Sequence, residues 1–227
     1  MPGPHHFGYW VPDLAAAVER AARTLSIGPF LVHRHVAFDT FRMADGTEIT
    51  DPAFFDHTAA FAAWGPIVLE LAEVHSIDER LASAYGIGFD RIGHVSWVTE
   101  DLEAEGSRLE AAGCKPIHRA ATGAVQVAWY SGGTLFPHPI ELHRAGAPIL
   151  GMPARLAAAA RNWDGRDLML DLVADPDSKN SFTTESGEHR RDPTAARADR
   201  RRRPVRPRGR PGTGEERAHR PGLRAGP

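Results

Sequence analysis

Two histidines and two glutamates recur at matching places in two stretches of the chain. His6 opens the apolar run HFGYWVP and His94 opens HVSWVTE, and an Asp-Leu pair follows each run. Glu70 lies in IVLELAEV and Glu141 in PIELHR, near the ends of the two stretches. Two imidazoles and two carboxylates form a mixed nitrogen and oxygen donor set, which suits a divalent first-row metal. The pattern predicts a metal site built by an internal duplication.

Such a site has a defined chemistry. Four protein ligands leave one or two positions of an octahedral metal for water or substrate. The metal acts as a Lewis acid, which holds a carbonyl oxygen and stabilises the enolate that forms when the α-proton leaves. A ligating glutamate can also serve as the base, because it already lies beside the substrate. The donor set therefore predicts proton transfer next to a carbonyl, with Glu70 and Glu141 as the catalytic candidates.

Each stretch is patterned as a strand, a helix and then three strands. Asp13 and Asp101 are natural N-caps for the two helices. The first helix is indicated by apolar residues at helical spacing, and the second by a seven-residue repeat before Gly113, which is well placed to end it. These positions are Leu14, Val18, Ala21 and Leu25 in the first helix, and Leu102 and Leu109 in the second.

The strands expected after the helices are short apolar runs. They cover 29–36, 54–63 and 67–74 in the first stretch, and 115–119, 124–130 and 137–143 in the second. Gly132-Gly133 indicates a hairpin turn in the second stretch. The first stretch is 17 residues longer between its histidine and its glutamate, and the polar segment 44–52 is the expected insertion.

The predicted architecture is α+β, with two βαβββ modules at 4–74 and 90–146. The modules pair their sheets about a pseudo-twofold axis into one cupped mixed β-sheet, which brings the histidines and glutamates together. Residues 147–173 are expected to form a short extension with a helix at 153–162. Residues 174–227 are expected to be a disordered basic tail.

Composition narrows the class of protein. The chain has 42% hydrophobic and 25% charged residues, the balance of a soluble globular protein, and no apolar run long enough to span a membrane. The first residues lack the pattern of a secretory signal. The single cysteine, Cys114, excludes a disulfide framework and multi-cysteine metal sites. We therefore expect a cytoplasmic protein without a membrane partner.

The charge is divided unevenly along the chain. Residues 189–227 carry thirteen arginines against four acidic residues, whereas all five tryptophans lie in the first 163 residues. The tail has too little apolar surface to fold. Its arginines could contact nucleic-acid phosphates, but it has no interleaved aromatic residues on which bases could stack. A solvated tail is the favoured interpretation, and no nucleic-acid partner is expected.

The segments HHFGYWVPDLAAAVE, IVLELAEV, RIGHVSWVTEDLEAEG and PIELHR resemble the four metal-bearing segments of the vicinal oxygen chelate superfamily. Within it, residues 4–145 are most similar to the glyoxalase-like and methylmalonyl-CoA-epimerase-like branch. The resemblance implies the glyoxalase/bleomycin resistance/dihydroxybiphenyl dioxygenase-type fold. It also implies that His6, Glu70, His94 and Glu141 bind a divalent ion (Ni, Co, Mn, Zn or Fe), with Glu141 as the base.

The resemblance implies an epimerase, an isomerase or a glyoxalase-type lyase acting on a small carbonyl compound or thioester. A homodimer is compatible with it, since the site forms within one chain or between two chains in this superfamily. One alternative is a non-catalytic drug-binding protein like the bleomycin-resistance proteins, which generally lack the complete ligand set. Another is an extradiol-type dioxygenase, which uses two histidines and one glutamate, so that the carboxylate of Glu70 argues against it.

Other polar residues are weaker candidates. Methylmalonyl-CoA epimerases tend to carry an acidic residue in the strand before the second ligand, where this chain offers only Asp56 and His57. His33 and His35 share one face of a predicted strand and could border the site, although an edge or core position is the favoured interpretation. His143 shares a strand face with Glu141 and is a candidate for supporting it.

Two further expectations concern the ligand choice and the pocket. His5 is adjacent to His6 but should point to the other side of the strand, so His6 is the expected ligand. An apolar lining from Trp10, Trp64 and Trp97 would favour a bulky acyl group as substrate.

Overall fold

The computed structural model describes residues 3–172, so the predicted basic tail at 174–227 lies outside the described residues. The first unit begins with strand β1 (His6–Trp10) and helix α1 (Leu14–Leu25). The Asp13 side chain accepts a hydrogen bond from the backbone N–H of Ala16 and caps the helix as predicted. Leu14 and Val18 are buried, whereas Leu25 is exposed, so the buried face of α1 is shorter than the pattern suggested.

The second unit repeats this arrangement with β6 (His94–Thr99) and α3 (Leu102–Ala111). The Asp101 carboxylate accepts hydrogen bonds from the backbone N–H groups of Glu103 and Ala104. Gly113, with a φ of +88°, follows the end of the helix in the left-handed region that glycine favours. Both predicted helix starts are therefore confirmed.

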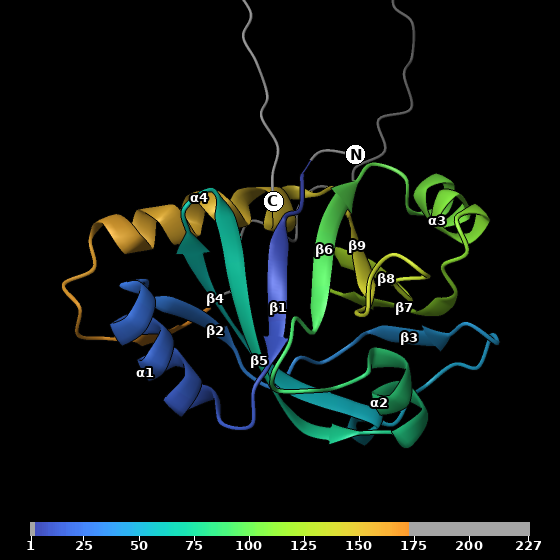
Figure 1. The fold of residues 1–227 in the computed structure, drawn as a ribbon, viewed down its shortest axis with the longest axis horizontal. Helices are drawn as coiled ribbons and strands as arrows, with labels where there is room; N and C mark the ends of the chain where they lie inside the picture. The colour runs from blue at the N-terminus through green and yellow to red at the C-terminus, as the bar shows by residue number, and fades with distance from the viewer. Residues whose placement is uncertain (1–2, 173–227) are drawn as a thin grey trace, which may run out of the picture. The chain divides into compact units, whose positions relative to one another are not determined.

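The remaining strands join β1 and β6 in one ten-stranded sheet, with β1 and β6 at its centre (Figure 1). In the first unit they are β2 (Phe30–His33), β3 (Thr40–Met43), β4 (Phe55–Trp64) and β5 (Ile67–Ile77). In the second unit and after it they are β7 (Pro116–Thr122), β8 (Val125–Tyr130), β9 (Ile140–Arg144) and β10 (Met169–Asp171).

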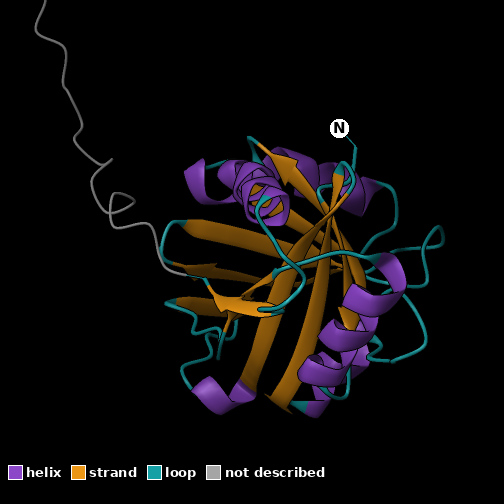
Figure 2. Cartoon of the chain, turned by 90° about the vertical axis from the view of Figure 1, so that its left-hand side faces the viewer, coloured by secondary structure: helices purple, strands orange, loops and turns teal. Residues whose placement is uncertain are grey.

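The order of the strands repeats about the centre of the sheet. From one edge to the other it is β10-β2-β4-β5-β1-β6-β9-β8-β7-β3. Helix α1 packs against β4 and β5, and α3 packs against β8 and β9, the equivalent strands of the second unit. The chain thus has the α+β fold with a paired, mixed sheet that was predicted, and Figure 2 shows how the strands curve between the helices.

Three local predictions need correction. Gly132-Gly133 does lie between two antiparallel strands, β8 and β9, but within a long connection, 131–139, and the tight two-residue turn is Gly123-Ala124, between β7 and β8. Helix α4 (Ala147–Arg161) begins six residues before the predicted start and contains Pro153. The strand predicted at 29–36 ends at His33, because the backbone turns at His35, which has a φ of +46°.

Strand β3 was not predicted. It leaves the first unit and pairs with β7 at the edge of the second. It lies in the connection 34–54, which also holds a short 3-10 helix (Pro52–Phe54) and the polar segment 44–52. The second unit joins β7 to β8 with only two residues. The extra residues of the first unit therefore form a strand that covers the sheet edge of the second unit.

The other helix is α2 (Glu79–Tyr85), which links the two units and is capped by Asp78. Leu81 and Tyr85 of α2 are buried in a core that also contains Trp10 and Trp129. None of the helices within residues 3–172 is long and apolar enough to cross a membrane.

Candidate functional site

The central strand pair places the two predicted histidines. Strands β1 and β6 run antiparallel, with His6 opposite Ser96 and Gly8 opposite His94. A β-carbon at Gly8 would overlap the imidazole ring of His94. Glycine at this position therefore lets the His94 ring lie across β1, towards His6.

The flanking strands place the two predicted glutamates. Strand β5 runs parallel to β1 and sets Glu70 beside Gly8, while β9 runs parallel to β6 and sets Glu141 beside Ser96. Because side chains alternate along a strand, these registers direct both carboxylates to the face that carries the histidines. Each unit therefore supplies one histidine from its first strand and one glutamate from its last.

The four side chains meet in one buried cluster. His6 Nε2 lies 3.0 Å from Glu70 Oε2, 3.1 Å from Glu141 Oε2 and 3.2 Å from His94 Nε2. His94 Nε2 lies 3.2 Å from Glu70 Oε2 and 3.6 Å from Glu141 Oε2. All four residues are at most 7% exposed. The structure thus brings together the whole set that the sequence predicted.

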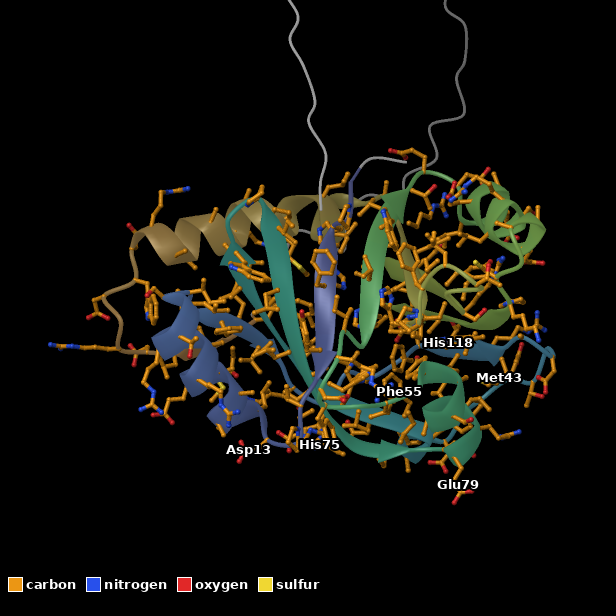
Figure 3. The ribbon with its side chains drawn as sticks, in the orientation of Figure 1. Asp13, Met43, Phe55, His75, Glu79 and His118 are labelled. Carbon is orange, nitrogen blue, oxygen red and sulfur yellow. The ribbon has the colours of Figure 1, made fainter. Side chains whose placement is uncertain are left out.

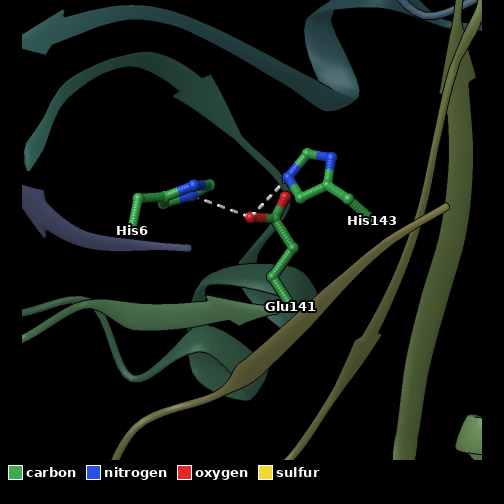
Figure 4. A group of neighbouring side chains, drawn as sticks. All are labelled: His6, Glu141 and His143. Atoms are coloured by element: carbon green, nitrogen blue, oxygen red, sulfur yellow. Dashed lines mark ion pairs between the residues drawn. The ribbon is translucent and has the colours of Figure 1, made fainter. Parts of the chain in front are cut away.

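A third histidine joins this cluster from β9. His143 Nε2 lies 3.0 Å from Glu141 Oε2, on the side of the carboxylate away from His6 (Figure 4). His143 is buried and follows Glu141 by two residues, so both point to the same face of β9. The prediction that His143 supports Glu141 agrees with this contact.

His5 contacts His6 on the side of the imidazole ring opposite the carboxylates. Its Nδ1 lies 2.9 Å from Nδ1 of His6, and its Nε2 lies 3.2 Å from the carbonyl oxygen of Ile149. His5 thus touches the ring nitrogen of His6 that faces away from the cluster, leaving Nε2 of His6 to the carboxylates. Metal-binding histidines usually engage their second ring nitrogen in a hydrogen bond, and here the partner of His6 is another imidazole.

The donor atoms fit a metal ion better than a hydrogen-bond network. At metal–ligand distances of about 2.1 Å, adjacent donors of a tetrahedral or octahedral ion lie about 3.0–3.4 Å apart, which matches most separations in the cluster. Glu141 Oε2 is buried and lies close to two imidazole nitrogens, yet it has no hydrogen-bond partner among the described residues. A shared cation would satisfy this oxygen, whereas the present contacts do not.

The electrostatics of the cluster also favour a cation. Burial alone would lower the pKa of His6, but the carboxylates of Glu141 and Glu70 outweigh it and raise that pKa to about 9. Burial would raise the pKa of both glutamates, but the neighbouring histidines hold each pKa below its usual range. The cluster therefore keeps two buried carboxylates ionised and attracts positive charge to the space between them.

Comparison with known proteins identifies the family. A family model described as Glyoxalase/Bleomycin resistance protein/Dioxygenase superfamily matches residues 5–129. The chain belongs to this superfamily. The match spans His6, Glu70 and His94, while Glu141 and His143 lie beyond its end.

The chain is similar to solved structures that include proteins named as methylmalonyl-CoA epimerases. A methylmalonyl-CoA epimerase from Mycobacterium tuberculosis is 18% identical, with a TM-score of 0.39 over 66% of this chain and 91% of its own. A Streptomyces coelicolor methylmalonyl-CoA epimerase variant in complex with 2-nitronate-propionyl-CoA is 15% identical, with a TM-score of 0.41 over 64% and 95%. A hypothetical protein from Bacillus halodurans is 15% identical, with a TM-score of 0.42 over 63% and 94%. No curated protein sequence matches the chain.

The cluster of this superfamily member opens into a cavity of about 110 Å³. The cavity is lined by all four predicted ligands and His143, together with many aromatic rings. Phe55 of β4 and His118 of β7, both labelled in Figure 3, each contact the ring of Tyr85, with centroids 5.5 and 5.7 Å away. Side chains from both units and from α2 thus form the cavity wall.

Sequence reasoning missed part of this wall. Tyr85 Oη lies 2.5 Å from Nε2 of His118, and both side chains are buried beside Trp129. Burial lowers the pKa of His118 to about 3 and raises the pKa of Tyr85. The only signal was a histidine inside the apolar strand pattern PIHRAAT, and this signal does not identify a partner 33 residues away.

The weaker histidine and aspartate candidates separate into two groups. His57 is buried and lines the cavity, stacked on Phe55 with centroids 4.4 Å apart, and His33 also lines it. Asp56 instead points away and contacts the exposed ring of His35 at 2.9 Å. Of the two candidates for a second acid or base, only His57 faces the site.

The predicted tryptophan lining is correct for one residue of three. Trp10 lines the cavity, but Trp64 is 41% exposed at the end of β4, and Trp97 packs against Phe136 away from it. Strand position explains the error, since alternate residues of β6 point to opposite faces and His94 and Trp97 are three apart. Cys114 is buried and lies outside the cavity lining.

Proposed function

We propose that the chain is a divalent-metal-dependent enzyme that transfers a proton next to a carbonyl group, as an epimerase, an isomerase or a glyoxalase-type lyase. The observation that carries this proposal is the convergence of four buried donor atoms, two from each unit, at separations of 3.0–3.6 Å. His6, Glu70, His94 and Glu141 would hold the ion. When bound, it supplies Lewis-acid stabilisation of negative charge on a carbonyl oxygen.

Glu141 is the proposed base. Its carboxylate faces the cavity and has His143 as an additional neighbour at 3.0 Å, a contact that Glu70 lacks. A carboxylate in this position can accept the α-proton and return it to the same carbon or to a neighbouring atom. The apolar walls limit the access of water, so that the proton is transferred within the site rather than to solvent.

The substrate class that follows is a small carbonyl compound or thioester with an acidic α-hydrogen. The donor set supports an enzyme over a drug-binding protein, since apolar walls alone would suffice for sequestering a ligand. Glu70 supports proton transfer over dioxygenase chemistry, because its carboxylate takes a position that oxygen and substrate would need.

Metal analysis of protein purified without a histidine tag tests the proposal directly. We expect about one equivalent of bound divalent metal after incubation with nickel, cobalt, manganese and zinc. His6→Ala and His94→Ala should each weaken metal binding by about tenfold or more. His35→Ala is the matched control, because this histidine is exposed and lies outside the cluster. Less than about a tenth of an equivalent in the unmodified protein would overturn the metal site.

Hydrogen exchange in heavy water tests the reaction class. A panel of ketones and thioesters is incubated with the metal-loaded protein, and loss of the α-proton signal is followed by NMR. We expect exchange of at least one compound to depend on both the metal and Glu141. Tight binding without exchange would favour the drug-binding alternative, and oxygen consumption would favour the dioxygenase.

A further inference from the structure

The wall of the cavity opposite the cluster is aromatic. Among the described residues that line the cavity, six contribute aromatic hydrocarbon or indole rings: Trp10, Phe38, Phe55, Phe61, Tyr85 and Trp129. The ring of Phe61 lies edge-on to His6, with centroids 6.2 Å apart, so the aromatic surface reaches the cluster itself. A flat apolar group bound here would make edge and face contacts on several sides.

This wall carries no permanent positive charge. The lining, within residues 3–172, includes no lysine or arginine, and its only acidic side chains are Glu70 and Glu141 of the cluster. The histidines His33, His57 and His118 do not replace a cation, since burial lowers the pKa of each, to about 4 for His57 and about 3 for His118. A carboxylate on the substrate, away from the cluster, would thus be buried without a partner, which is costly.

The size of the cavity limits its occupant to one ring. Its volume is about 110 Å³, somewhat smaller than the roughly 150 Å³ of an apolar cavity that accepts benzene, so there is no room for a larger planar group. Four half-buried lining residues form one rim of the cavity: Val36 and Phe38 in the loop after β2, and Thr122 and Val125 at the ends of β7 and β8 on either side of their turn. These two segments are tied together by a hydrogen bond from Gly123 N–H to Asp39 Oδ2, at 2.7 Å.

We propose that this cavity binds the uncharged, planar end of the substrate, an aryl or similar unsaturated group next to the carbonyl, and that it rejects substrates with a second carboxylate. The role of the carbonyl rests on the proposed function above. The preference for an uncharged ring rests on the cavity walls alone, so it holds for the protein with or without metal.

Three small ketones separate these features. Acetophenone carries a ring next to a carbonyl, 3-acetylbenzoate adds one carboxylate to that ring, and 2-butanone has no ring. Binding to the full-length protein is measured by quenching of tryptophan fluorescence and by calorimetry, once without metal and once with cobalt. We expect acetophenone to bind at least tenfold more tightly than either of the other two ketones in both forms.

A substitution at the rim of the cavity tests whether the ring of the ketone binds there. Phe38→Ala removes a half-buried ring from the lining and should reduce the preference for acetophenone over 2-butanone by at least threefold. Phe61→Leu, beside His6, is a second variant that keeps apolar volume, and it should reduce the same preference. Phe89→Ala is the matched control, because this ring is 64% exposed and outside the lining, and it should change nothing.

The outcomes distinguish this inference from the proposed function. Equal affinity for the three ketones within about twofold, or tightest binding of 3-acetylbenzoate, overturns the preference for an uncharged ring. A preference that Phe38→Ala and Phe61→Leu leave intact places the ring elsewhere and also overturns it. If cobalt is not retained but acetophenone is still preferred, the metal site fails and the inference on the cavity stands.

Discussion

The two strands that carry the glutamates of the site, β5 and β9, have matching sequences around the glutamate that differ at one of three positions. Strand β5 carries Glu70-Leu71-Ala72, and β9 carries Glu141-Leu142-His143. Ala72 and His143 therefore occupy matching places, two residues after the glutamate. Glu70 Oε2 contacts only the two histidines that both glutamates share, whereas Glu141 Oε2 also contacts His143.

A second difference lies on the histidine strands. Gly8 of β1 faces His94, while Ser96 of β6 faces His6. A β-carbon at Gly8 would overlap the His94 ring, whereas Ser96 carries a side chain at the equivalent place opposite His6. Duplication therefore explains how the four donors converge. The departures from symmetry fit the proposed roles, in which Glu70 only holds the ion and Glu141 also acts as the base.

The largest effect should come from exchanging the glutamates for glutamine. Glu141→Gln keeps the shape and one oxygen donor but removes the basicity, so turnover should fall by about 100-fold or more at full metal occupancy. Glu70→Gln should lower metal affinity, and excess metal should restore most of its turnover. Metal content and the rate of α-proton exchange are measured on the same samples. A Glu141→Gln protein that binds metal normally and exchanges at the unmodified rate would falsify the assignment of the base.

A smaller effect is expected at the pair Gly8 and Ser96. Gly8→Ala introduces a β-carbon that overlaps the His94 ring, so the ring must move and metal affinity should fall by about tenfold. Ser96→Ala removes a buried hydroxyl that has no hydrogen-bond partner among the described residues, and it should leave affinity within about twofold. Affinity is measured by competition with a chelator, and circular dichroism verifies that both proteins fold. Equal affinities for the two variants would contradict the asymmetry.

His143 should matter less than the ligands themselves. His143→Leu removes the imidazole beside Glu141 and keeps apolar volume, so turnover should fall severalfold while metal is retained. Since proximity to His143 lowers the pKa of Glu141, its loss should raise that pKa and move the acidic limb of the pH–rate profile to higher pH. His138→Leu is the control, because this histidine is also buried but lies outside the cavity lining. An unshifted profile would show that His143 does not tune the base.

The repeat explains why much of the fold and the cluster could be predicted from the sequence. Paired Asp-Leu caps fix where each helix starts, and alternation along the strands fixes the face to which His6 and Glu70 point. These are local rules, so one chain is enough to apply them. They identified all four clustered donors, which lie on four different strands.

The parts that could not be predicted depend on contacts between distant segments. Strand β3 is short and edge-placed, and only its pairing with β7 defines it. Tyr85 and His118 meet because α2 packs against the second unit, and no sequence pattern encodes this contact. The turn at Gly123-Ala124 was missed because Gly132-Gly133 offers the stronger local signal. Composition likewise could not tell which tryptophans line the cavity.

The two buried histidines of the cavity wall extend the comparison to stability. His57 comes from the first unit and its Nδ1 has no hydrogen-bond partner among the described residues, while His118 comes from the second and contacts Tyr85. Burial lowers the pKa of His57 to about 4 and that of His118 to about 3, from 6.5. In the unfolded chain both titrate near pH 6.5, so between about pH 6.5 and 4 the unfolded state binds more protons than the folded state.

This difference predicts that the metal-free protein loses stability as the pH falls. The contribution of each histidine is complete above pH 6.5 and should shrink by about 1 kcal/mol between pH 7 and 5.5. His57→Leu should remove one of these two contributions, so the loss between the two pH values should be about 1 kcal/mol smaller than in the unmodified protein. Urea unfolding followed by tryptophan fluorescence at pH 7 and 5.5 gives both values, and His75→Leu, at an exposed position, is the control. If His57→Leu leaves the pH dependence unchanged, then His57 is charged or solvated in the folded protein, and the cavity wall is more polar than the uncharged-ring preference requires.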